Sequence, residues 1–496
     1  MKIRDIVFAG ALACQQAFGV ECAAPESVGV SSSTLVRFID ELEKHKWPDN
    51  EYQSFVVMKD GKIIAEAYRA PYKADMPRFV ASITKGFTGI AIGFAVQEKL
   101  VSLDERLVDI FPDHLPDPLP KNAEKVTVRH LLTMQTGQDR CAAGAMSKDK
   151  DHVRGFFMEP FVFEPGTSFR YNSGASNMLS QIITQRTGMS MCDYLTPRLF
   201  EPLEFGIPEW SADDNGVNFG GWGIAVTPRQ MALLGQFCVQ KGMWNGRQLL
   251  NRQWFDDMTA NPAPTMDRHI ADADWNYGYG LHVWLTHVNG VTRFDGSGGQ
   301  YIIMMPEDNA VLAVTGCVSS FTPLMNILWD YLYPGLHGDR VPEVPDAANV
   351  LKKRLAEFKC PLPIAADGGF PAHVNVDFTK EKLVFDGDEL TLGVVSLDFN
   401  GKELRFSVGD SAPVRFSVGN WALNEMDTDF DRLFPMTFFG AAAVTAPNEL
   451  TLICRPVTAP YISKIVFKVD GDRVSMCFSD IQKTQTVVGN VKMECR

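Results

Sequence analysis

At 496 residues the chain is long enough for more than one domain, and with 45% hydrophobic and 22% charged residues its composition is typical of a globular protein. The formal net charge of −13, without a dense run of lysine and arginine, argues against nucleic acid or an anionic membrane surface as the main partner. The ten cysteines are far apart and the nine histidines show no metal-binding spacing. We therefore expect mostly reduced thiols, no bound metal and no cofactor.

The N-terminal segment, residues 1–24, has only a weak resemblance to an export signal. Two basic residues precede the short apolar run 6–13, but Asp5 interrupts the basic part and Gly10 breaks the apolar run. This pattern favours a cytoplasmic protein and leaves export open. No later stretch is long and apolar enough to predict a transmembrane segment.

Turn signals and hydrophobic periodicity place the elements of the first two thirds of the chain. The predicted elements are a hairpin at 53–69, an apolar helix beginning near residue 82, a Pro-rich loop at 111–120, a capped helix at 127–134, helices at 175–187 and 227–240, a hairpin at 300–314 and an amphipathic helix at 322–333. Hairpins at both ends of a helical middle predict an antiparallel sheet flanked by helices. The fold class is therefore α/β (α+β).

The last third of the chain has a different pattern. Residues 336–362 are rich in proline, glycine and charge, which predicts a linker after a domain at 25–335. Beyond it, short alternating strands dominate, including the near-repeat Arg-Phe-Ser-Val-Gly at 405–409 and 415–419. We expect 363–496 to form a small all-β accessory domain, a sandwich or a barrel.

The most informative motif is Ser82-Ile83-Thr84-Lys85, where a serine and a lysine lie one helical turn apart. The amine can take the hydroxyl proton, and the helix N-terminus favours the negative charge that develops there. The same spacing recurs at 147–150, in a charged stretch typical of a solvated loop. Only Lys85 precedes a small, apolar helix, where a buried lysine is costly unless it is paired or functional. The alternative is a lysine that extends from a core helix to solvent.

Three more segments accompany this motif, namely Pro165–Asn177, Gly220–Met231 and Phe294–Tyr301. With them, residues 25–335 resemble the serine β-lactamase and penicillin-binding-protein superfamily. The resemblance is to the class C β-lactamase-related branch, which includes family VIII esterases, D-aminopeptidases and 6-aminohexanoate-dimer hydrolases. It implies a β-lactamase/transpeptidase-like fold, in which a helical subdomain accompanies the sheet.

The resemblance also implies roles for individual residues. Ser82 would be the nucleophile, Lys85 its proton-accepting partner, and Tyr171 the second acid/base, the counterpart of the tyrosine in a Tyr-x-Asn motif. A phenol beside an ammonium is a reasonable shared-proton pair. Whether Lys85 or Tyr171 is the general base stays open, because coupled groups titrate as a unit.

The chain departs from the family pattern in two places. Ser173 stands where Tyr-x-Asn has asparagine, with Asn172 one position earlier, and both are candidates for substrate binding. The third motif contains neither lysine nor histidine, so the cation that normally helps to hold the carboxylate of a β-lactam is missing.

A strand through Gly296, Ser297 and Gly298 can still supply an oxyanion hole. In that arrangement the Ser297 N–H would donate together with the Ser82 N–H.

These observations predict a cofactor-free serine hydrolase that cleaves a small-molecule ester or amide through an acyl-enzyme. Two alternatives remain open. One is a true β-lactamase, D-Ala-D-Ala carboxypeptidase or D-aminopeptidase, and the other is a non-catalytic binding or sensor protein on the same fold.

Overall fold

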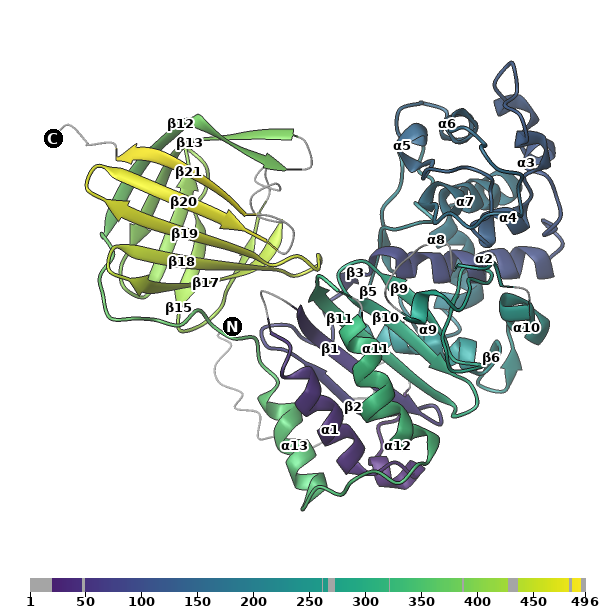
Figure 1. Cartoon of the computed structure of the whole chain (residues 1–496), viewed down its shortest axis with the longest axis horizontal. Helices are drawn as coiled ribbons and strands as arrows, with labels where there is room; N and C mark the ends of the chain where they lie inside the picture. The colour runs from purple at the N-terminus through teal and green to yellow at the C-terminus, as the bar shows by residue number, and fades with distance from the viewer. Residues whose placement is uncertain are drawn as a thin grey trace, which may run out of the picture.

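The computed structural model describes residues 20–46, 50–260, 262–265, 273–320, 322–385, 388–426, 436–480 and 484–491. The chain forms two parts: a first part built on a six-stranded sheet with helices, and a C-terminal part that is entirely β (Figure 1). The residues of the weak export-like pattern, 1–19, lie outside the described residues.

The central sheet of the first part is antiparallel and has the order β2-β1-β11-β10-β9-β8. Its strands are β1 (Asn50–Lys59), β2 (Lys62–Tyr68), β8 (Trp284–Leu285), β9 (Thr292–Gly296), β10 (Gln300–Met305) and β11 (Ala310–Val318). Both predicted hairpins are confirmed. They join through β1 and β11, where Phe55 lies opposite Val314, so the two ends of the domain share one sheet as expected.

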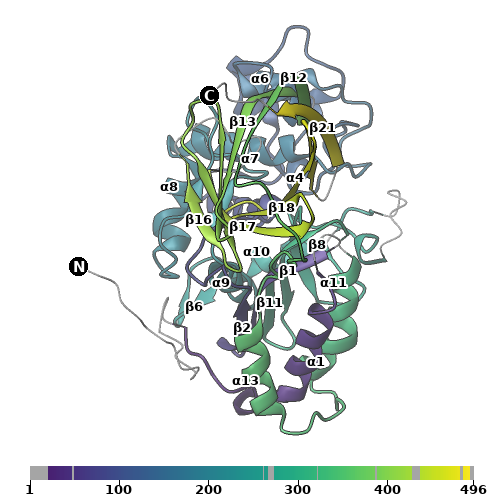
Figure 2. The same ribbon diagram turned by 90° about the vertical axis from the view of Figure 1, so that its left-hand side faces the viewer.

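Each face of this sheet carries its own core, because successive side chains of a strand point to opposite faces. Phe55 and Val57 pack in the cluster beneath α1 (Ser32–Leu42), whereas Val56 and Met58 belong to the larger cluster on the other face. The first face is covered by α1 together with α11 (Thr322–Ile327), the π-helical turn Leu328–Leu332, α12 (Tyr333–His337) and α13 (Ala347–Glu357) (Figures 1 and 2).

The opposite face carries α2 (Thr84–Gln97) and α9 (Pro228–Val239), and the helical lobe lies beyond them (Figure 1). α2 is buried from Thr84 to Ala95, which confirms the predicted core helix. Capping boxes begin α9 at Thr227 and α4 (Val128–Leu132) at Thr127.

The remaining helices and strands of the first part are short, apart from α7. The helices are α3 (Leu107–Ile110), α5 (Ala143–Met146), α6 (His152–Met158), α7 (Ser173–Thr187), α8 (Met191–Leu195) and α10 (Arg252–Ala260). The strands are β3 (Arg78–Phe79), β4 (Glu209–Trp210), β5 (Ile224–Val226), β6 (Met243–Trp244) and β7 (Arg247–Gln248). Single 3₁₀ turns lie at Pro25–Val28, Ala81–Ile83, Pro112–His114, Ala123–Lys125 and Ala273–Trp275, and a second π-helical turn at Thr196–Phe200.

The C-terminal part is a β-barrel, which confirms the predicted all-β domain. Its strands are β12 (His373–Phe385), β13 (Asp388–Phe399), β14 (Glu403–Val408), β15 (Val414–Val418), β16 (Ala422–Glu425), β17 (Thr437–Ala446), β18 (Glu449–Pro456), β19 (Ser463–Asp470), β20 (Arg473–Ser479) and β21 (Thr484–Val491). A parallel pairing of β15 with β17 closes the sheet. The near-repeat supplies the neighbouring strands β14 and β15, and Phe406 and Phe416 point into the core.

Two segments differ from the sequence expectation. The region 336–362, predicted to be a linker, contains α13, whose Leu351 is buried in the core beside α1. Residues 21–23 lie along β2, where Cys22 bridges to Ile63. Cys22 is disulfide-bonded, whereas the other described cysteines are free thiols, as predicted. Of the helices described, none has both the length and the hydropathy to cross a membrane.

Candidate active site

The predicted nucleophile, Ser82, lies on the 3₁₀ turn Ala81–Ile83 that leads directly into α2. The preceding strand β3 is fixed by antiparallel pairing with β5. Ala81 has φ of +48°, a left-handed conformation that is strained for a residue with a side chain. Strain next to a half-buried serine at the start of a buried helix is typical of a functional site.

Lys85 is 2% exposed and directs its amine toward Ser82. Its Nζ lies 3.1 Å from Ser82 Oγ, 3.1 Å from Ser173 Oγ and 2.8 Å from the carbonyl oxygen of Gly221. The same Nζ lies 4.7 Å from the centroid of the Tyr171 ring. Three segments that are far apart in the sequence therefore meet around one amine.

Burial lowers the pKa of Lys85 to about 7, because the ammonium loses its hydration; the Cys141 thiol has a smaller, opposite effect. A substantial fraction of Lys85 is therefore neutral at neutral pH. A neutral amine at hydrogen-bond distance can accept the Ser82 hydroxyl proton.

Tyr171 forms an aromatic wall beside the amine. Its ring stacks on Trp284, with centroids 5.9 Å apart and planes inclined by 15°, and meets Tyr279 edge to face at 6.2 Å. Trp284 and Tyr279 are themselves buried. The phenol of Tyr171 is thus held close to Lys85 by packing rather than left to rotate in solvent.

The two residues after Tyr171 have different surroundings. Ser173 contacts Lys85, where the family pattern has a carboxamide. Asn172 is fully buried and caps α7: its Oδ1 accepts from the N–H groups of Ala175 and Ala142, and its Nδ2 donates to Gln138. These bonds occupy the Asn172 side chain, so it supports the loop that carries Tyr171 and Ser173.

The third motif lies against the nucleophile turn. At Gly296, the last residue of β9, a Cβ atom would lie 2.2 Å from the Val80 carbonyl oxygen, so only glycine permits this approach. Ser297 follows and is exposed. Neither the Ser82 N–H nor the Ser297 N–H donates a hydrogen bond to any described residue.

No free cation precedes Gly296 on β9. Phe294 packs against Gly86 of α2, where a Cβ would lie 2.8 Å from its ring. Arg293 is fully buried, and its guanidinium donates to Asp295 at 3.0 Å and to the Asp274 carbonyl. Where the superfamily often has lysine or histidine, β9 therefore carries the Phe294 ring and the Asp295 carboxylate, which is paired with Arg293.

Sequence reasoning missed two contributors. Gly221 lies in the second motif, but nothing in the motif shows that its carbonyl accepts from Lys85. His282 is buried beneath the site, with Nε2 2.9 Å from Ser176 Oγ and Nδ1 2.9 Å from the Leu132 carbonyl. Burial lowers the pKa of His282 to about 3, so it is a neutral structural histidine. Within the described ranges, no group of three or more metal-ligating side chains occurs.

A mixed fold of this topology, with a serine and a lysine one turn apart beside a tyrosine, is an arrangement of the β-lactamase/transpeptidase type. The chain belongs to the β-lactamase family, whose model matches residues 53–320.

The similar proteins include hydrolases of this family. A 6-aminohexanoate-dimer hydrolase from Paenarthrobacter ureafaciens is 21% identical over 316 residues, which cover 58% of this chain and 78% of that protein. A D-aminopeptidase from Brucella anthropi is 24% identical over 308 residues, covering 54% of this chain and 55% of that protein. A solved penicillin-binding-protein homologue from Caulobacter crescentus has a TM-score of 0.50 at 16% identity, covering 62% of this chain and 99% of that chain, which supports the fold.

Proposed function

We propose that this chain is a serine hydrolase that cleaves an ester or amide bond through an acyl-enzyme on Ser82. The observation that carries the proposal is the 3.1 Å contact between Ser82 Oγ and the buried Lys85 Nζ, whose pKa burial lowers to about 7. An amine of that pKa matches the task of a general base at neutral pH.

The steps follow from the positions of the groups. Ser82 Oγ attacks the carbonyl carbon while its proton passes to Lys85, directly or through Tyr171. The N–H groups of Ser82 and Ser297 receive the oxyanion of the tetrahedral intermediate. The intermediate collapses as the leaving alcohol or amine takes the proton, and a water molecule then cleaves the acyl-enzyme by the same sequence.

The preferred substrate is an ester or amide without an essential carboxylate at the third motif. Asp295 lies there, and its partner Arg293 is buried, so a substrate carboxylate would meet no free cation on β9. The alternative is a β-lactamase, a D-Ala-D-Ala carboxypeptidase or a D-aminopeptidase. Turnover of nitrocefin as fast as that of p-nitrophenyl acetate would favour the β-lactamase over the esterase.

The chain contains its own matched control for the nucleophile. Ser147 begins the second Ser-x-x-Lys pattern, but its hydroxyl is exposed and donates to the nearby Gly144 carbonyl. Ser82→Ala is expected to lower the turnover of p-nitrophenyl acetate by about three or more powers of ten, whereas Ser147→Ala leaves it unchanged. Equal turnover by the two folded variants would refute the proposal. Failure of the wild type to react with a fluorophosphonate would favour a binding or sensor protein.

A further inference from the structure

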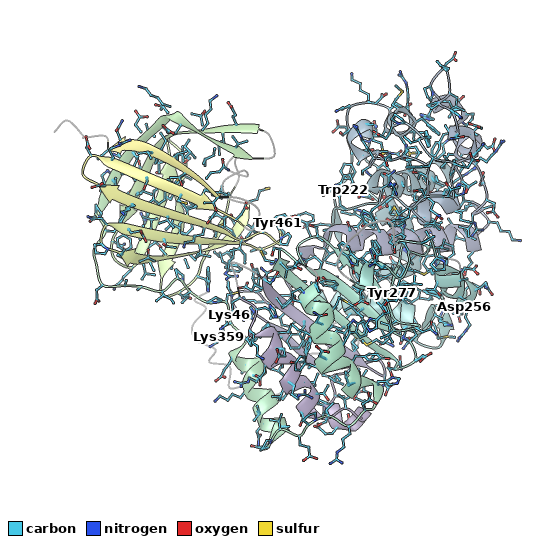
Figure 3. The ribbon with its side chains drawn as sticks, viewed as in Figure 1. Lys46, Trp222, Asp256, Tyr277, Lys359 and Tyr461 are labelled. Carbon is cyan, nitrogen blue, oxygen red and sulfur yellow. The ribbon has the colours of Figure 1, made fainter. Side chains whose placement is uncertain are left out.

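The loop between β18 and β19 of the barrel, residues 457–462 and here called the barrel loop, contacts the segment that leads to Ser82. The N–H of Phe79 donates to the Thr458 carbonyl at 2.8 Å, and Arg78 donates to the Ala459 carbonyl at 3.0 Å. Figure 3 shows Tyr461 of this loop where the barrel meets the first part of the chain. A loop more than 370 residues further along the chain thus pairs with the strand just before the nucleophile.

Arg78 holds the loop in place. The side chain is 3% exposed and also donates to the carbonyls of Val457 at 3.0 Å and Pro456 at 3.3 Å, and to Gln53. Its guanidinium lies 4.5 Å from the centroid of the Tyr72 ring. Both Nη atoms of this buried arginine donate to carbonyls of the barrel, so the loop is anchored to the interior at this point.

The other side of the loop touches the third motif. A Cβ on Gly298 would lie 2.9 Å from Cβ of Pro460, so the proline ring packs against the Gly298 backbone. Gly298 follows Ser297, and Phe79 lies three residues before Ser82. The barrel loop therefore borders both segments that carry the proposed oxyanion donors.

Buried contacts between the two parts fix the barrel in this position. Arg455 and Glu51 form an ion pair whose side chains are 1% and 0% exposed, with Nη2 3.0 Å from Oε2. Ile462 and Ile453 of the barrel pack with Cys317 of β11. A buried ion pair and an apolar cluster thus join the barrel to the first part of the chain.

Tyr461 stands out within this loop. Its two neighbours, Pro460 and Ile462, are buried, yet the tyrosine is 40% exposed. A large ring left exposed between two buried residues, on a loop that contacts Phe79 and Gly298, is positioned to contact a bound substrate.

We propose that the barrel loop forms one wall of the substrate site and that Tyr461 determines specificity by contacting an apolar group of the substrate. The inference rests on the proposed serine-hydrolase function and adds the class of group recognised: an apolar acyl or alcohol chain. The barrel and the first part then form one catalytic unit, and the accessory domain selects substrates.

The test compares full-length Tyr461→Ala, Tyr461→Phe and Val488→Ala with the wild type on p-nitrophenyl esters from acetate to decanoate. Val488 is exposed on β21 of the same barrel, away from the loop. Tyr461→Ala is expected to change the ratio of kcat/KM between long and short esters by at least about fivefold, mainly in KM. Tyr461→Phe should keep the wild-type ratio, since the ring makes the contact.

A smaller change of the ratio in Tyr461→Ala would overturn the proposal, and so would an equal loss on every ester, which indicates a structural effect. Labelling rates with short-chain and long-chain alkyl fluorophosphonates are compared in the same way, so the result does not depend on turnover. The outcome is separable from that of the proposed function: retained activity in Ser82→Ala refutes the hydrolase mechanism, whereas an unchanged ratio with an essential Ser82 refutes only the role of Tyr461.

Discussion

Protonation of Lys85 is the perturbation that tests the base most sharply. The amine is buried, and the loss of hydration lowers its pKa to about 7, against 10.5 for an ordinary lysine. Only the neutral amine can accept the Ser82 proton, so activity should rise with pH. For one group with a pKa of 7 the neutral fraction is about a half at pH 7, about a tenth at pH 6 and about a hundredth at pH 5.

The assay is kcat/KM for p-nitrophenyl acetate between pH 5 and 9, corrected for spontaneous hydrolysis, with circular dichroism at each pH to confirm folding. The expected profile is a single acid limb with a midpoint near 7 that loses about a hundredfold by pH 5. A flat profile down to pH 5, or a midpoint above 9, would refute the assignment of a desolvated amine as the base.

Three further predictions concern the surroundings of this amine and the joint between the two parts. If Lys85 is the base, Tyr171→Phe should lower kcat but keep the midpoint of the pH–activity profile near 7. If the acid limb of that profile is lost in Tyr171→Phe, the phenol of Tyr171 is the base instead. Gly86→Ala should reduce the free energy of unfolding by about 1–3 kcal/mol, because the added Cβ meets the Phe294 ring at 2.8 Å; an unchanged urea midpoint would contradict this packing. Glu51→Gln should cost about 3–5 kcal/mol by leaving Arg455 buried without its charge partner, and a chemical denaturation curve equal to that of the wild type would show that the pair is not buried.

The sequence predicted those structural features that depend on residues close together in the chain. The Ser82–Lys85 spacing, the apolar run after it and the capping residue Thr127 each act within a few residues, and the structure has the corresponding turn, buried helix and cap. The two hairpins were equally visible, because alternating strands flank short turns rich in glycine, asparagine and aspartate.

What sequence did not predict depends on contacts between distant segments. Spacing could not tell which of Asn172 and Ser173 faces Lys85, because that depends on where the cap of α7 falls. α13 lies in a region of linker-like composition, and its burial comes from packing on α1. The barrel loop and Arg78 are 379 residues apart in the sequence, and no local pattern predicts a contact between them.

The central claim is a covalent one, and mass spectrometry tests it directly. Wild-type protein quenched in acid during turnover of a slowly deacylated ester should gain the mass of one acyl group, and peptide mapping should place that group on Ser82. The adduct should be absent from Ser82→Ala and present in Ser147→Ala. Turnover by Ser82→Ala at the wild-type rate, or an acyl group carried by any other residue, would contradict the account.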